Sequence, residues 1–117
     1  MTFYDSNGIA VAYSEDNENI YLYNGKPVAY LFNGLVYRFN GTQLGRFENG
    51  WVRDKMGYCV FFTENAKGNG PIKPAKHIKP IKEAKQIKPI KRIRHVPAIK
   101  VANNLTWSSF SGLSFFA

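Results

Sequence analysis

The chain of 117 residues has little of what membrane-spanning and disulfide-bonded proteins use. Cys59 is its one cysteine, so no intramolecular disulfide forms. No apolar stretch approaches the roughly 20 residues that a membrane-spanning helix needs. The first residues, MTFYDSNG, do not combine a basic start with an apolar run, so we expect no secretory signal. We therefore predict a reducing, cytoplasmic location.

Groups that hold metals or perform catalysis are scarce. His77 and His95 lie eighteen residues apart, and Cys59 lies in a different segment, so no metal site is expected. The calcium-loop pattern is absent, and the glycines belong to turns and not to a phosphate-binding loop. Nothing beside Cys59 in the sequence is a base that would activate it. We predict no catalytic residue, no cofactor, no metal and no enzymatic activity.

The net charge of +8 is unevenly distributed. Residues 1–66 hold five basic and seven acidic residues, residues 67–100 hold eleven basic residues and one acidic residue, and residues 101–117 hold none. We predict a β domain over 1–66, a basic strap or linker over 67–100 and an apolar docking segment over 101–117.

The first segment repeats one unit four times. Gly25, Gly41 and Gly57 are sixteen residues apart, and Gly8 lies seventeen before Gly25. Two aliphatic columns accompany the glycines: Phe3, Ile20, Val36 and Val52, and Val11, Val28, Leu44 and Val60. A repeat of this kind is one supersecondary unit that buries its apolar face against the next copy. We expect both columns to be buried.

The turn signals identify the unit. Asn-Gly pairs, the strongest hairpin signal, occur at Gly25, Gly34, Gly41 and Gly50, with short β-branched and aromatic runs between them. Each unit is predicted to hold two antiparallel strands. We predict an all-β fold of four two-stranded repeats around a pseudo-fourfold axis. An open meander is the alternative, but it would leave its end strands unpaired.

The strap is built from ten triplets over residues 71–100, typified by PIK. The middle residue is isoleucine, valine or alanine in all ten triplets, and the third is basic in nine. A period of three fits polyproline II, and the prolines exclude a continuous helix. A disordered charged linker is the alternative reading. The strict aliphatic column indicates instead that part of the strap lies against a surface, with the acidic body of this or a neighbouring chain as the candidate.

The last segment carries apolar rings and no charge, so we expect it to dock on a β surface. Its spacing at 107, 110 and 113 would suit one short helical face, which Asn103 or Asn104 would cap. The predicted docking residues are Trp107, Phe110, Phe115 and Phe116.

The stretch IYLYNGKPVAYLFNGLVYRFNGTQLGRFENGWVRDKMGYCVFF, from Ile20 to Phe62, resembles the bacterial four-fold β flower proteins. The triplet tail and the ending WSSFSGLSFFA, which begins at Trp107, resemble them as well. The resemblance implies four β units around a pseudo-fourfold axis and brings no catalytic residue. Tails in similar proteins look like PAR triplets, so the aliphatic edge of this strap is larger.

Three functions remain open. We expect a non-catalytic scaffold or interaction module whose strap and C-terminal segment dock on its own or a partner subunit, as a homo-oligomer or with another protein. The alternative is a non-specific nucleic-acid or anionic-surface binder. Its predicted anion-binding residues are Lys73, Lys76, Lys79, Lys82, Lys88, Lys91, Arg92 and Arg94.

The third function is binding of a small ligand or carbohydrate at an aromatic axial pocket. The candidates are residues where one copy departs from its siblings, together with one tyrosine: Trp51, Arg46, Arg53 and Tyr30. The competing interpretation is that the aromatic residues simply fill a small core.

Overall fold

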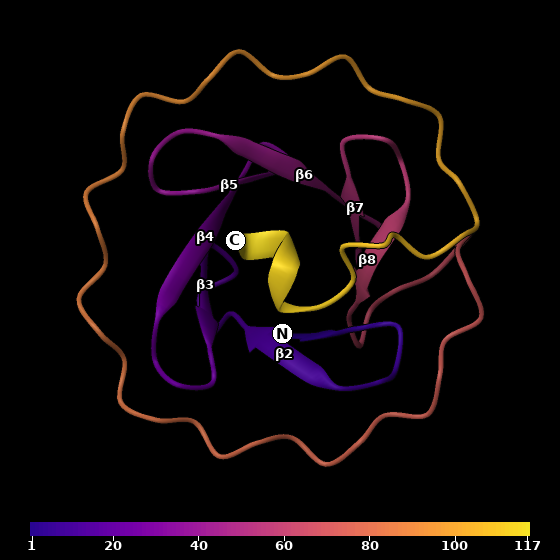
Figure 1. The fold of residues 1–117 in the computed structure, drawn as a ribbon, viewed down its shortest axis with the longest axis horizontal. Helices are drawn as coiled ribbons and strands as arrows, with labels where there is room; N and C mark the ends of the chain where they lie inside the picture. The colour runs from indigo at the N-terminus through magenta and orange to yellow at the C-terminus, as the bar shows by residue number, and fades with distance from the viewer.

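The computed structural model describes residues 1–117, and its body is a closed antiparallel barrel whose eight strands follow chain order (Figure 1). The strands are β1 (Thr2–Tyr4), β2 (Ala10–Tyr13), β3 (Asn19–Leu22), β4 (Pro27–Phe32), β5 (Leu35–Tyr37), β6 (Gln43–Glu48), β7 (Trp51–Asp54) and β8 (Cys59–Phe62). The prediction of four two-stranded repeats is confirmed. β1 pairs with β8, so no open meander forms.

The four repeats have the same local geometry. The register between the two strands of each repeat shifts at one place, between residues 3 and 4, 20 and 21, 36 and 37, and 52 and 53. A β-bulge of this kind bends and twists the strand, which helps short hairpins to curve into a small barrel. The turns that end at Gly8, Gly25, Gly41 and Gly57 lie on the strap side of the barrel. We call them the strap-side turns.

The interior is filled by the first aliphatic column. Phe3, Ile20, Val36 and Val52 are each at most 1% exposed. Next to this column the neighbouring strands approach closely, which requires small residues. At Gly45, for example, a Cβ would overlap the Arg53 carbonyl of the adjacent strand. The expectation that the second column is buried is wrong for three of its four members. Val60 is buried, while Val11, Val28 and Leu44 pack at the margin of the core and stay partly exposed.

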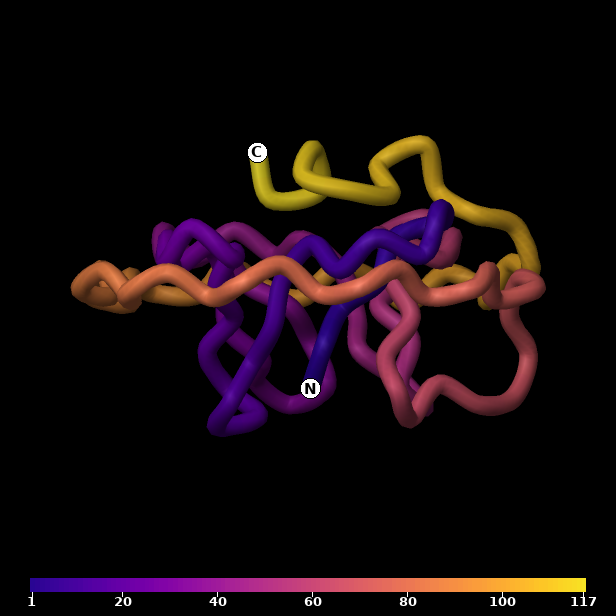
Figure 2. Tube along the Cα trace, turned by 90° about the horizontal axis from the view of Figure 1, so that it is seen from below, coloured from indigo at the N-terminus to yellow at the C-terminus, as the bar shows by residue number.

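The strap encircles the barrel as a single ring (Figure 1). Seen from the side, it forms a flat band around the barrel, and the whole molecule with the strap measures 36 × 35 × 22 Å (Figure 2). Residues 71–104 form neither helix nor strand. The three-residue pattern therefore belongs to an extended segment that has no secondary structure of its own and is held by contacts with the barrel.

The C-terminal segment crosses one end of the barrel, and the N-terminus lies at the other (Figure 2). The expected helical face at 107, 110 and 113 is wrong. Trp107 forms a parallel bridge with Cys59, and only η1 (Leu113–Phe116) is helical, as one 3₁₀ turn. Gly112, with a φ of 118°, keeps the chain before η1 out of a helical path.

Candidate functional site

The strap backbone contacts each of the four repeats in the same way. The N–H groups of His77, Gln86, His95 and Asn104 donate to the carbonyls of Gly8, Gly25, Gly41 and Gly57, at 3.0, 2.9, 2.8 and 3.0 Å. The donors are spaced nine residues apart, so three triplets span one repeat. The strap thus matches the period of the barrel.

The basic edge of the strap faces the body. Lys76, Lys85 and Arg94 lie over the rings of Tyr4, Tyr21 and Tyr37, at 5.3, 5.1 and 5.9 Å from the ring centroids. This is the geometry of cation–π contacts. In the fourth repeat Arg53 replaces the tyrosine, and the strap position nine residues after Arg94 is the neutral Asn103. The strap thus carries no basic residue at the position that would face the Arg53 cation.

Ion pairs to the rim of the barrel add to these contacts. Lys79, Lys82, Lys91 and Lys100 pair with Glu64, Glu15, Glu18 and Glu48, at 3.8, 3.1, 2.8 and 3.0 Å. Lys85 also binds Glu15, and hydrogen bonds from Lys85 and then Lys82 lower the pKa of the Glu15 carboxyl. Lys73 donates to the Ala66 carbonyl at 2.8 Å.

The predicted anion-binding residues thus lie in different surroundings. Lys79, Lys82 and Lys91 are ion-paired within the chain, while Lys88 makes no ion pair. Anion binding by the strap stays a prediction.

The two ends of the strap meet at Arg53. Its Nη1 donates to the carbonyls of Asn104, at 2.7 Å, and Gly57, at 2.9 Å, while its Nη2 donates to Asn69 at 2.6 Å. Trp51 Nε1 donates to the Lys67 carbonyl at 3.0 Å beside it. Both side chains are 2% exposed. The strap starts and finishes at the fourth repeat. The residues of that repeat contact both strap ends and therefore differ from those of the other three repeats.

The four predicted ligand-binding residues do not line a common cavity. Arg46 donates to the Ala98 carbonyl at 2.8 Å and thereby also holds the strap. Tyr30 is 1% exposed and lies under Lys91, whose Nζ is 4.5 Å from the ring centroid. Their contacts fix the strap, and ligand binding by them stays a prediction.

The C-terminal segment contacts the body through three of its four predicted docking residues. Trp107 packs against Trp51 and Phe62, with ring centroids 6.1 Å away in both cases. Phe115 and Phe116 lie on Phe61, at 5.7 and 5.5 Å. Phe110 remains 55% exposed. The segment thus covers the end of the barrel.

The aliphatic edge of the strap points away from the body. Its exposed members, which we call the aliphatic belt, are Ile72, Ile78, Ile81, Ile87, Ile90, Ile93, Val96 and Ile99. Each is between 87% and 97% exposed. The expectation that this edge lies against the body of the same chain is wrong. The basic edge takes that place because the rim of the barrel offers carboxylates and tyrosine rings.

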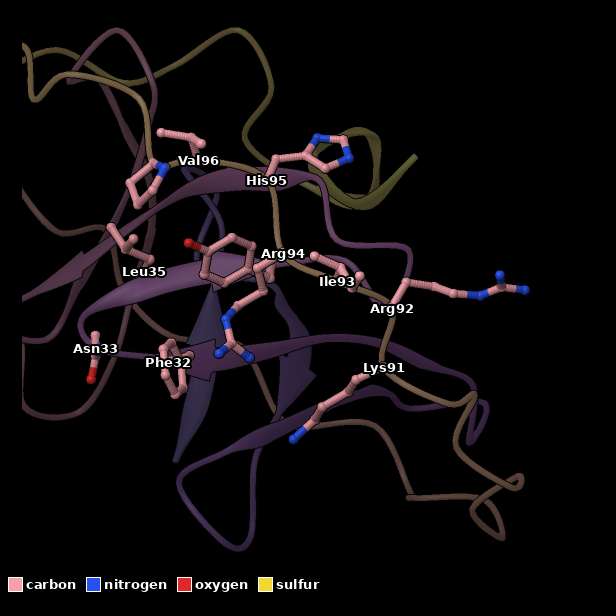
Figure 3. A pocket seen from close by; sticks show the side chains of 11 residues that line it. Phe32, Asn33, Leu35, Lys91, Arg92, Ile93, Arg94, His95 and Val96 are labelled. Carbon is pink, nitrogen blue, oxygen red and sulfur yellow. The ribbon is translucent and has the colours of Figure 1, made fainter.

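A groove opens between the strap and the β4–β5 hairpin (Figure 3). It has a volume of about 650 Å³ and lies between residues 32–37 and 91–97, and we call it the Arg94 groove. The guanidinium carbon of Arg94 lies 3.6 Å from the ring centroid of Phe32, which is 40% exposed. Phe32 was not among the residues that the sequence pointed to.

Comparison with known families agrees with this architecture. Residues 1–116 match the family model described as 4-fold beta flower protein. The chain belongs to this family. The match covers nearly all of this β flower protein, including the strap and the C-terminal segment, and it confirms the resemblance seen in the sequence. No curated protein and no solved structure matches the chain.

No group of three or more His, Cys, Asp or Glu side chains lies close enough together to hold a metal ion. No helix is long and apolar enough to span a bilayer. Burial raises the pKa of the Cys59 thiol, which is fully buried. The aliphatic belt is exposed to solvent, and the Arg94 groove is open beside it.

Proposed function

We propose that this β flower protein is a non-catalytic scaffold that associates with further copies of itself through the aliphatic belt. The observation that carries the proposal is the exposure of all eight belt residues, at 87% or more. Isolated exposed aliphatic residues are ordinary on soluble proteins. A series of them in one line around the rim is the kind of surface that marks an interaction site.

The strap presents these side chains on a fixed path. Its backbone is hydrogen-bonded to every repeat, at intervals of nine residues. Contact with a second copy therefore does not have to order a free chain, which would oppose association. Because each quarter of the rim offers a similar surface, one molecule can contact neighbours in several directions. Open arrays are then accessible as well as closed pairs.

Charge opposes this association and gives it a distinctive salt dependence. Each copy carries a net charge of +8, so two rims repel each other at low ionic strength. Salt screens that repulsion and leaves the apolar contact intact. Association should therefore strengthen as salt is added. Binding of nucleic acid by the same strap would weaken with salt, since it depends on counterion release.

Sedimentation velocity over a range of protein concentrations, at low and high salt, tests the proposal. The wild-type chain should associate, and more strongly at high salt. Replacing Ile78, Ile81, Ile87 and Ile90 together by alanine should leave a monomer. The strap accepts alanine at this triplet position, because Ala75 and Ala84 already occupy it.

A matched control is Ile9→Ala, which removes a 41% exposed isoleucine outside the belt and should change nothing. A wild-type chain that stays monomeric at every concentration and salt would overturn the proposal. So would equal association of the alanine variant. A salt-sensitive shift of DNA mobility by a monomeric protein would favour the nucleic-acid alternative.

A further inference from the structure

Three repeats place a glutamate at the same point on the rim, and the fourth does not. The second residue after Tyr13, Tyr30, Arg46 and Phe62 is Glu15, Phe32, Glu48 and Glu64, respectively. Each glutamate accepts an ion pair from the strap, with Lys82, Lys100 and Lys79 as donors. Phe32 supplies no carboxylate. One of four equivalent rim positions therefore lacks the anion that balances the strap.

The missing carboxylate leaves positive charge in the Arg94 groove. Arg92, Arg94 and His95 line it together with Lys91, and no aspartate or glutamate does. Lys91 is paired with Glu18 at 2.8 Å. In Figure 3 the Arg94 side chain lies beside Phe32, whereas Arg92 extends away from the groove. Arg94 is thus the central unpaired charge.

Arg94 is positioned but has no acceptor. Arg46 and Arg53 donate to backbone carbonyls, whereas Arg94 makes no ion pair or side-chain hydrogen bond. Its plane is held against the Phe32 ring, with the guanidinium carbon 3.6 Å from the centroid. A stacked guanidinium keeps its N–H edge free, in a fixed fork that fits a carboxylate.

A departure in the strap leaves space for a ligand. Position 97 is a proline, whereas the positions nine and eighteen residues earlier are Lys88 and Lys79. Lys79 reaches Glu64, so a lysine at this strap position can extend to the rim. Pro97 cannot do so, and Leu35 adds an apolar wall to the groove beside Phe32.

We infer that the Arg94 groove binds a small organic carboxylate with an apolar body. The carboxylate takes the place that glutamate holds at the three other rim positions and accepts hydrogen bonds from Arg94. The apolar body lies against Phe32 and Leu35. The volume of about 650 Å³ accommodates a ligand of a single ring or a short branched chain.

The test is an NMR titration of the full-length ¹⁵N-labelled protein with benzoate. Amide shifts should saturate and concentrate on residues 32–37 and 91–97. Acetate, which has the charge alone, and benzyl alcohol, which has the ring alone, should each bind at least about tenfold more weakly. Arg94→Gln should weaken benzoate by a similar factor. Lys88→Gln removes one unpaired strap charge outside the groove and should leave benzoate affinity within about twofold of wild type.

Phe32→Glu restores the carboxylate of the other repeats and should abolish benzoate binding. If that variant loses the dispersed amide spectrum of a folded protein, Pro97→Lys decides, because it fills the groove with a side chain that the strap already carries at equivalent positions. The inference is overturned if shifts spread along the whole strap or if acetate matches benzoate. It is also overturned if a folded Phe32→Glu or Pro97→Lys variant binds benzoate as wild type does.

Discussion

At the residue scale, the glycines of the strap-side turns serve two purposes. They adopt positive φ, and they let the strap backbone approach without a side chain between. A Cβ at Gly8, Gly25 or Gly41 would overlap the carbonyl oxygen of Ala75, Ala84 or Ile93. These three strap residues are nine apart, like the hydrogen-bond donors. The glycine column that identifies the repeat is thus also the surface on which the strap lies.

Gly8→Ala and Gly34→Ala form a matched pair that separates the two effects. Their φ values are 78° and 73°, so both substitutions carry a similar backbone strain of about 1 kcal/mol. At Gly34 the nearest atom to an added Cβ is 3.7 Å away, whereas at Gly8 the strap must move. We expect Gly8→Ala to lower the free energy of unfolding by about 2 kcal/mol more than Gly34→Ala. Urea unfolding of the two variants measures the difference.

Amide exchange shows where the effect acts. In Gly8→Ala the protection of the His77 N–H, which donates to the Gly8 carbonyl, should fall. In Gly34→Ala it should stay. Equal unfolding energies for the two variants would contradict a role of Gly8 in holding the strap.

At the element scale, the C-terminal segment closes one end of the barrel. Phe115 is 6% exposed and packs edge-on against Phe61, within the same cluster as the aliphatic column. Phe110 lies five residues earlier and is 55% exposed. The segment therefore offers one anchored and one exposed phenylalanine for comparison.

Phe115→Ala should lower the free energy of unfolding by about 3 kcal/mol, because it empties a packed position on the barrel core. Phe110→Ala should change it by less than about 0.5 kcal/mol. Chemical denaturation followed by tryptophan fluorescence reports both, since Trp107 packs on Trp51 beside the strap junction. A Phe115→Ala variant as stable as wild type would show that packing of this segment on the end of the barrel does not stabilise the fold.

The sequence predicted the elements better than it predicted their faces. Glycine spacing and Asn-Gly turns indicate hairpins directly, because few residues other than glycine and asparagine tolerate a positive φ. The triplets offer a basic edge and an aliphatic edge, and nothing in that pattern says which one faces the body. The answer depends on the Glu15, Glu48 and Glu64 rim, which belongs to another segment.

Some residues of the site could be recognised in the sequence only after the strap was aligned with the repeats. The contacts of Arg53, the loss of a basic residue at Asn103 and the Phe32 position become visible only once nine strap residues are set against one repeat. That ratio follows from the circumference of the closed barrel, so it could not be read before the barrel was known. Repeats predict which positions are equivalent, and tertiary structure supplies the partner.

At the scale of the whole molecule, charges of opposite sign hold the strap to the barrel. The rim carboxylates have lowered pKa values. For Glu15 the cause is the hydrogen bond from Lys85 and then that from Lys82. For Glu48 and Glu64, burial raises the pKa, but the hydrogen bond from Lys100 and that from the Thr2 amide outweigh it. The same pairing raises the pKa of Lys85.

These shifts set the pH range of stability. A carboxyl group with a lowered pKa stabilises the fold above its ordinary value of 4.5, and that contribution is lost as the pH falls through the lower folded value. Lys85 behaves in the opposite way, so its contribution is lost only above its ordinary value of 10.5. The free energy of unfolding should therefore be nearly constant from about pH 4.5 to about pH 9 and should fall below that range. It should also fall above about pH 9, because burial raises the pKa of the Cys59 thiol above its ordinary value of 9.0.

Urea unfolding at a series of acidic pH values measures this profile. The carboxylates lie at three of the four rim positions, so their protonation weakens the attachment of most of the strap. Strap amides should therefore lose exchange protection before the amides of the barrel strands do. Glu15→Gln removes the partner of both Lys82 and Lys85 and should make the acid limb less steep, while Glu48, Glu64 and Asp16, whose pKa values are also lowered, keep the rest of it. Glu83→Gln, which changes an exposed strap glutamate without an ion pair, should leave that limb as it is. Stability that stays constant down to about pH 2 would show that the rim carboxylates do not hold the strap.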